Sequence, residues 1–160
     1  MRSSEKDEGK RAQEIALGIL ARRDTSAAEL SRRLRDKGIG PDLANETVAR
    51  CHQWGYLDDR RFARQWAESA IRNGRGFGPR LRLDLERRGV PADVVAEVLA
   101  SLSEEYGEVE TLTALLAKKF AGFAAATATD REKRRVVQYL QRRGFSIAAI
   151  FQAFRMGEDC

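Results

Sequence analysis

One short pattern occurs three times in this sequence, and it constrains the fold more than any other feature. An apolar residue is followed four positions later by a leucine, and after four more by a glycine and an apolar residue. Apolar residues four apart share one face of an α-helix, and glycine adopts the left-handed conformation that ends a helix. Each copy therefore predicts a helix, a glycine stop and a second helix. The copies lie at residues 30–39, 81–90 and 136–145.

The similarity extends beyond the glycines, which lie 51 and 55 positions apart. Eight positions after each glycine stands Glu46, Glu97 or Gln152, and ten positions after it stands Val48, Leu99 or Phe154. A third helix is expected before each pair, at about residues 12–22, 60–73 and 105–120. No segment alternates apolar and polar residues as a half-buried strand does. We therefore predict an all-α fold, an elongated, curved array of three tandem three-helix repeats.

This pattern divides the chain into tails and repeats. Residues 1–11 are expected to form a disordered N-terminal tail, and residues 157–160 a C-terminal tail. Between them lie repeat 1 at 12–57, repeat 2 at 58–103 and repeat 3 at 104–156. Inside repeat 3, the segment near 121–129 is rich in alanine and threonine and is expected to be a flexible connection.

Polar residues mark where several of the helices should begin. Ser26 with Glu29, and Thr129 with Glu132, have the spacing of a capping box, in which each side chain bonds to the other residue's backbone amide. Asp58 is expected to cap a helix that starts at the next residue. These signals agree with the helix boundaries that the repeats predict.

Four aromatic residues cluster where the first and second repeats meet. A small three-helix module must bury its open face against its neighbour, so we expect these side chains to pack in a core. The alternative is that they stack on nucleic-acid bases or contact a partner. They are Trp54, Tyr56, Phe62 and Trp66.

Arginine is concentrated in the middle of the chain, which carries a net charge of +5 overall. Residues 60–88 hold nine arginines against three acidic residues, and residues 131–143 form a second basic block. The planar guanidinium group suits bidentate contacts to phosphate or carboxylate, so these arginines are candidates for binding a polyanionic partner or DNA. The candidates are Arg60, Arg61, Arg64, Arg72, Arg75, Arg80, Arg82, Arg87 and Arg88.

A glycine-rich turn at residues 74–78 lies among these arginines, flanked by Arg72, Arg75 and Arg80. It follows a helix and lacks the Gly-Lys-Ser/Thr ending of a nucleotide-binding loop. Two interpretations stay open at this stage. Its amides and the three arginines could hold phosphate or an acidic partner loop, or the turn could simply be basic and solvated.

The chain offers little material for catalysis or metal binding. His52 is the single histidine, and Cys51 and Cys160 are far apart, so no zinc site or disulfide framework is expected. Adjacent Asp58 and Asp59 point in different directions at a helix start and are explained by capping and ion pairing. We therefore expect no enzyme activity, no catalytic residue, no metal and no cofactor.

The stretch at 55–66, Gly-Tyr-Leu-Asp-Asp-Arg-Arg-Phe-Ala-Arg-Gln-Trp, is followed by Arg-Asn-Gly-Arg-Gly-Phe-Gly-Pro-Arg at 72–80 and by the second repeat pattern. This combination closely resembles the signature of the RecX family, and weaker matches extend from about residue 16 to residue 154. The resemblance implies tandem three-helix repeats without enzymatic activity. It also implies binding in the groove of RecA filaments on single-stranded DNA, with reduced ATP hydrolysis, strand exchange and co-protease activity. Family members also bind DNA themselves.

The resemblance thus points to a regulator of the RecA nucleoprotein filament in DNA repair, recombination and the SOS response. No apolar run approaches the ~20 residues of a membrane span, and the N-terminus has no apolar signal core, so we expect a soluble, cytoplasmic protein. We also expect it to be a monomer. Its expected partners are RecA and single- or double-stranded DNA. The alternatives are a general basic nucleic-acid-binding helical module and a helical scaffold that joins other proteins.

Overall fold

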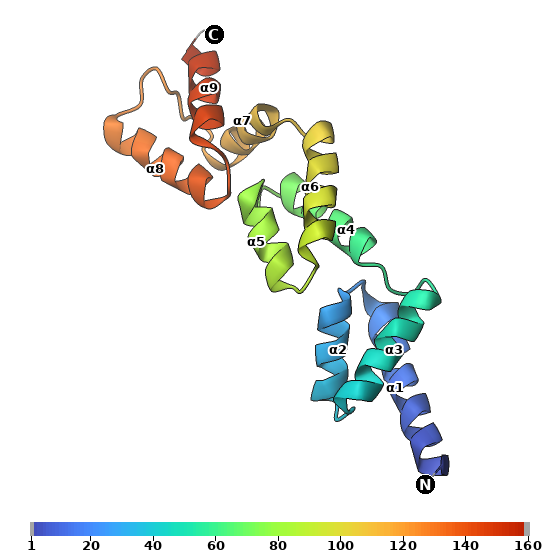
Figure 1. Ribbon diagram of the computed structural model, residues 1–160. Helices are drawn as coiled ribbons and strands as arrows, with labels where there is room; N and C mark the ends of the chain where they lie inside the picture. Colours follow the sequence, from blue (N-terminus) through green and yellow to red (C-terminus); the bar gives the residue numbers. More distant parts are fainter. Residues whose placement is uncertain (1, 159–160) are drawn as a thin grey trace. The chain divides into compact units, whose positions relative to one another are not determined.

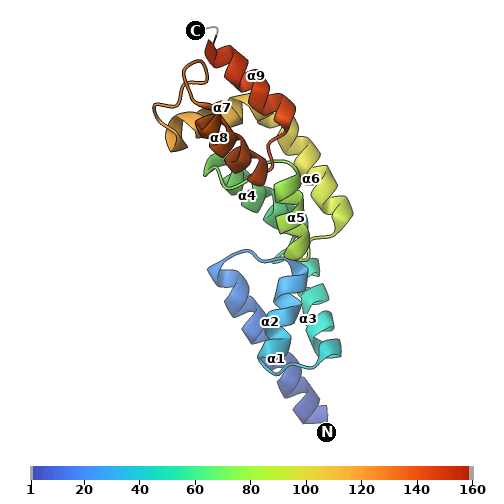
Figure 2. The ribbon, with the colours of Figure 1, turned by 90° about the vertical axis from the view of Figure 1, so that its left-hand side faces the viewer.

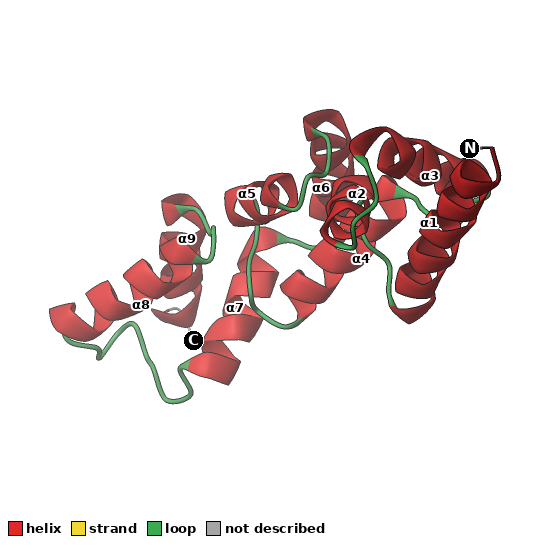
Figure 3. Cartoon of the chain, turned by 90° about the horizontal axis from the view of Figure 1, so that it is seen from below, coloured by secondary structure: helices red, strands yellow, loops and turns green. Residues whose placement is uncertain are grey.

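The computed structural model describes residues 2–158, and in this range all regular structure is α-helical (Figures 1 and 3). The helices come in three groups of three, which confirms the predicted all-α fold of three-helix repeats. The first repeat has α1 (Arg2–Arg22), α2 (Ala27–Asp36) and α3 (Pro41–Gln53). The second has α4 (Asp59–Arg72), α5 (Pro79–Arg87) and α6 (Ala92–Glu105). The third has α7 (Glu108–Lys119), α8 (Asp130–Arg142) and α9 (Ile147–Glu158).

The repeated pattern forms the same helix ending in all three repeats. In the first repeat, Gly38 has a φ of 92°, and the amide of Ile39 donates a hydrogen bond of 3.1 Å to the carbonyl of Leu34. This is the Schellman ending, in which a left-handed residue lets the chain close back on the helix. Leu34 and Ile39 are both buried. The pattern therefore ends a helix and supplies two core residues. The equivalent bonds join Val90 to Leu85 and Phe145 to Leu140, both at 3.1 Å.

The described chain forms two compact units. One comprises residues 2–65 with 85–95, and the other residues 66–84 with 96–158. The boundary falls inside α4, α5 and α6, so the second repeat contributes to both units. The first unit contains α1, α2 and α3 side by side (Figures 1 and 2), around a core of Ala12, Ala16, Ile19, Leu30, Leu34, Ile39, Ala44, Cys51 and Leu57. In the second unit, α9 packs against α7 and α8.

The N-terminal segment differs from the sequence-based prediction. Helix α1 begins at Arg2, so residues 2–11 are helical, and the prediction of a disordered tail there was wrong. This segment has no apolar face, which suggested disorder. It nevertheless consists largely of glutamate, lysine and arginine, which favour helix, and it extends a helix that is already nucleated by a packed core. At the other end, Gly157 and Glu158 belong to α9, while residue 1 and residues 159–160 lie outside the described range.

The connection between α7 and α8 is irregular, as expected, but aromatic contacts tie it to the third repeat. The rings of Phe120 and Tyr139 meet edge to face with centroids 5.1 Å apart. The rings of Phe123 and Phe154 lie 5.4 Å apart, and Ala125 is buried. The flexibility predicted for this segment stays a prediction.

Two of the four clustered aromatic residues are not in a core. The side chains of Trp54 and Tyr56 are 47% and 55% exposed, whereas Phe62 is buried and Trp66 is partly buried. The prediction of core packing was therefore wrong for Trp54 and Tyr56. The reason is the turn after α3, where Gly55 has a φ of 78° and the core position falls to Leu57.

The predicted helix caps are present in the structure. The Asp58 carboxylate accepts a hydrogen bond of 3.1 Å from the Arg61 amide at the start of α4. Thr129 and Glu132 form a complete capping box. Ser26 accepts from the Glu29 amide, but the Glu29 carboxylate pairs with Arg88 instead of completing a box. That difference follows from tertiary structure, because Arg88 belongs to the next repeat.

The glycine turn of the second repeat also contacts the first repeat, and we call such a contact between consecutive repeats a joint. The Ser26 hydroxyl donates a hydrogen bond of 2.6 Å to the carbonyl of Arg88. A methyl group added at the next residue, Gly89, would overlap the side chain of Ala28. Glycine is therefore required here both for its left-handed φ of 85° and for the close approach of two chain segments.

The corresponding glycine of the first repeat has no such neighbour. Around Gly38 no atom lies within 4 Å of the place that a methyl group would take. The carbonyl before it, that of Lys37, accepts a hydrogen bond of 3.2 Å from the side chain of Arg11 in α1. In the first repeat, the carbonyl before the glycine therefore accepts its hydrogen bond from Arg11 of α1, in the same repeat. In the second repeat, the equivalent carbonyl accepts from Ser26, which belongs to the preceding repeat.

We predict that Gly89→Ala destabilises the protein more than Gly38→Ala. Both changes force a left-handed alanine, at about 1–2 kcal/mol. The change at Gly89 also creates an overlap with Ala28, which adds about 1–3 kcal/mol. Urea unfolding followed by circular dichroism measures both losses. Since both residues belong to the same compact unit, equal losses would contradict the proposed role of the joint.

Candidate functional site

The nine candidate arginines come from α4, α5 and the turns that follow these helices. Five of them belong to the first compact unit, namely Arg60, Arg61, Arg64, Arg87 and Arg88. The other four belong to the second unit, namely Arg72, Arg75, Arg80 and Arg82. The structure therefore divides the predicted block between two compact units.

Two arginines of the first unit pair with acidic residues of the first repeat. Arg61 lies 3.3 Å from Asp24, and Arg88 lies 3.4 Å from Glu29. The Asp59 carboxylate adds a third link, because it accepts a hydrogen bond of 2.8 Å from the amide of Ala27. These residues help to hold the second repeat on the first. Exposed ion pairs of this kind contribute only about 0–1 kcal/mol each, so they do not prevent an arginine from also binding a partner.

Three arginines of the second unit have local partners. Arg80 pairs with Asp84 at 3.2 Å, and Arg75 donates a hydrogen bond of 3.1 Å to the hydroxyl of Ser69. Arg72 lies 2.8 Å from Glu68. All three guanidinium groups are nevertheless exposed to solvent. They can exchange these intramolecular partners for a phosphate or a carboxylate of a bound molecule.

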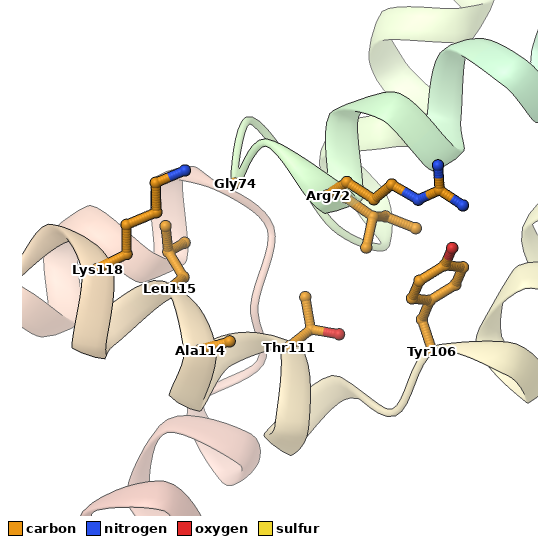
Figure 4. A pocket seen from close by; sticks show the side chains of 8 residues that line it. Arg72, Gly74, Tyr106, Thr111, Ala114, Leu115 and Lys118 are labelled. Carbon is orange, nitrogen blue, oxygen red and sulfur yellow. The ribbon is translucent and has the colours of Figure 1, made fainter.

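Arg72 belongs to a small polar network beside a recess (Figure 4). The hydroxyl of Tyr106 donates a hydrogen bond of 2.7 Å to Glu68. Hydrogen bonding with Tyr106, and then electrostatic interaction with Tyr106 and Glu68, raise the pKa of Arg72. The recess has a volume of about 220 Å³ and a mostly apolar lining that includes Leu115, with Lys118 as a second cation.

The glycine-rich turn at 74–78 is a packing joint. The ring of Phe77 is buried and stacks on Phe145 with centroids 5.2 Å apart and an interplanar angle of 11°. The amide of Phe77 donates a hydrogen bond of 2.8 Å to the carbonyl of Arg143, and the Arg143 side chain donates one of 3.2 Å to the carbonyl of Arg75. The turn is therefore not simply solvated, and the Phe77 amide is not available to phosphate, whereas binding of phosphate or an acidic loop by the three arginines stays a prediction.

This joint matches the one between the first and second repeats. The carbonyl that accepts from Phe77 again directly precedes the repeat glycine, here Gly144. A methyl group at Gly144 would overlap the carbonyl oxygen of Phe77. The sequence did not reveal the contact, because a lone phenylalanine among glycines gives no signal of where its ring packs.

Two exposed arginines on α5, Arg82 and Arg87, are the candidates best suited to charge reversal. Within residues 2–158, Arg82 and Arg87 take part in no ion pair. Reversing their charge should therefore disturb the fold less than reversing Arg61, Arg80 or Arg88. Among the nine candidates, they give the clearest test of partner binding.

The nine candidate arginines include none from the second basic block, at residues 131–143. The structure shows that Lys133 and Arg134 of this block line a groove together with Arg155 of α9. Their spacing from Asp130, three and four positions, is the signal that they share a face of one helix.

Cys51 and His52, which were expected to have no catalytic or metal-binding role, both take part in packing or hydrogen bonding within the fold. Cys51 is fully buried, and this burial raises the pKa of its thiol, so the thiol stays protonated. The Nδ1 atom of His52 lies 3.0 Å from the carbonyl of Leu57 in the turn after α3. In the described part of the chain, no cluster of three or more histidine, cysteine or acidic residues could hold a metal ion. The helices in this range include none long and apolar enough to span a membrane.

The geometry defines a class of protein, an all-helical chain of three-helix repeats joined through glycine turns and bearing exposed arginines. Three family models match the chain. The first three-helix domain of RecX matches residues 12–51, the second matches residues 58–99, and the third matches residues 106–154. The chain belongs to the RecX family of regulatory proteins.

Individual relatives agree with this assignment. The regulatory protein RecX of Syntrophotalea carbinolica is 39% identical over 139 residues, which cover 87% of this chain and 91% of the relative. That of Trichlorobacter lovleyi is 37% identical, with 87% and 90% covered. The crystal structure of RecX from Lactobacillus salivarius has the same fold, with a TM-score of 0.79 over 97% of this chain and 99% of that chain at 17% identity.

We predict that Phe77 and Phe145 are energetically coupled. Replacing either ring by alanine should cost about 3–5 kcal/mol, because a buried stacked ring is lost. The double variant should lose less than the sum of the two, by about 0.5–1.5 kcal/mol, which is typical of aromatic pairs. Urea unfolding of the four proteins completes the cycle. Additive losses would mean that the stacking contributes nothing beyond burial.

Proposed function

We propose that this protein binds the RecA filament on single-stranded DNA and inhibits its ATPase, strand-exchange and co-protease activities. The observation that carries the proposal is the match of all three RecX domain models across the chain. The protein acts in the cytoplasm, as a monomer and without catalysis or a cofactor, in DNA repair, recombination and the SOS response. It also contacts single- and double-stranded DNA.

The arginines supply a physical basis for this function. The nine candidates carry nine positive charges against three acidic residues in the same segment. Guanidinium groups bind both carboxylates and phosphates in a bidentate way, so the same kind of side chain can contact RecA and the DNA backbone. A regulator that binds one state of the filament more tightly than the others shifts the filament toward that state. Inhibition follows when the favoured state turns over ATP slowly.

The test compares two charge reversals that remove the same net charge. One is Arg82→Glu with Arg87→Glu on α5. The other is Arg22→Glu with Arg32→Glu in the first repeat. These four arginines are exposed and take part in no ion pair within residues 2–158, so neither double variant should unfold.

The measurement is the steady-state ATPase of RecA on single-stranded DNA, titrated with this protein well below one copy per RecA monomer. We expect the unmodified protein to reduce ATP turnover while most of the DNA remains uncovered. The variant with Arg82 and Arg87 reversed should need about tenfold more protein, equivalent to about 1.4 kcal/mol. The control should stay within about twofold.

The main alternative is a general basic nucleic-acid-binding module, which the net charge alone would support. It predicts that turnover changes only once the DNA is saturated with this protein. It also predicts that both double variants weaken binding equally, and that the logarithm of the affinity falls linearly with the logarithm of salt. DNA binding recorded in parallel at the same salt separates the two functions. A helical scaffold would show no dependence on nucleic acid at all.

A further inference from the structure

A groove lined by residues of α8 and α9 lies outside the nine-arginine block. Figure 1 shows these two helices of the third repeat. The groove has a volume of about 710 Å³. The α8 residues that line it include Lys133, Arg134 and Val137. Lys133 and Arg134 stand four and three positions before Val137, so both lie on its side of the helix. From α9 come Phe151, Phe154 and Arg155. Two helices of the third repeat thus present facing rows of side chains.

The floor of this groove is apolar and only half covered. Phe154 is buried and also contacts Phe123, which fixes its position. Phe151 meets Phe154 edge to face at 6.3 Å, and its side chain is 47% exposed. Val137 is partly buried beside them. An apolar side chain of a bound molecule would therefore cover the exposed part of Phe151 and gain the free energy of its burial.

The sides of the groove are cationic. Lys133, Arg134 and Arg155 line it, against the single carboxylate of Asp130. None of these three cations has an acidic partner in the described chain, and the one hydrogen bond of the Arg134 side chain goes to a backbone carbonyl at 3.4 Å. Their charge is therefore available to a negatively charged ligand.

We propose that this groove binds an acidic amphipathic peptide segment of a partner protein. Such a segment, held as a helix, would place large apolar side chains on Phe151 and Val137 and its carboxylates beside the three cations. The groove suits nucleic acid less well. Phe154 is buried, so Phe151 offers the single exposed aromatic ring on which a base could stack in this groove. The nine-arginine block shares no residue with this groove, so the two sites can be tested separately.

The probe is a fluorescein-labelled synthetic peptide of about fourteen residues, with leucines at helical spacing and glutamates between them. Fluorescence anisotropy follows its binding to the full chain. We expect saturable binding that weakens with added salt. Replacing the glutamates by lysines, or the leucines by serines, should each weaken binding at least about tenfold, because the proposal needs both charge and apolar contact.

Variants of the protein locate the binding site. Phe151→Ser should weaken peptide binding about tenfold, and so should Lys133→Glu combined with Arg155→Glu. The matched control is Arg131→Glu with Arg135→Glu, which removes the same charge from exposed positions of α8 outside the groove. This control should change binding less than about twofold. Circular dichroism and urea unfolding verify that each variant is folded.

Three results would overturn the proposal. The first is no saturable binding of the acidic peptide to the unmodified chain. The second is equal loss in the groove variants and in the matched control, which would indicate nonspecific attraction. The third is a groove with another occupant. A labelled oligothymidylate that binds in place of the peptide and is lost in Phe151→Ser would identify nucleic acid, and a dimer in sedimentation that the same substitution dissociates would identify a second copy of this chain.

Discussion

Each repeat depends on the turn that follows its second helix. The amide after the glycine bonds to the carbonyl of the leucine five residues earlier, and both residues flanking this closure are buried in every repeat. The turn therefore ends one helix, sets the direction of the next helix and contributes two buried residues to the core. The carbonyl of the residue before the glycine takes no part in this hydrogen bond. It accepts a hydrogen bond from Ser26 in one joint, and from the Phe77 amide in another.

The two joints explain why the compact units do not coincide with the repeats. Each unit contains one joint, between the first and second repeats or between the second and third. A small module of three short helices buries too little surface to be stable alone and must pack on a neighbour. The second repeat therefore divides its residues between both units. Its arginines are likewise distributed over both units. Arg61 and Arg88 form ion pairs with acidic residues of the first repeat and so stabilise the joint between the first and second repeats.

Local signals in the sequence predicted much of this architecture. Asp58 and Thr129 cap helices as expected, because capping depends on a few neighbouring residues. The leucine and glycine spacing predicted the helix pairs for the same reason. The wrong predictions have two causes. Trp54 and Tyr56 are large aromatic residues, which suggested a core, but the local turn at Gly55 exposes them. Residues 2–11 have no apolar face, which suggested disorder, but they extend a helix whose stability comes from packing further along α1.

The sequence by itself determined the all-helical repeat fold and the family, since both follow from the order and spacing of residues along the chain. It also determined where positive charge is concentrated. Only the tertiary structure decided which charges have intramolecular partners, that the turn at Phe77 is a joint, and that Lys133, Arg134 and Arg155 share a groove with Phe151. The physical reason is that hydrogen bonds, ion pairs and burial join residues distant in sequence, and a spacing pattern carries no information about which surfaces meet.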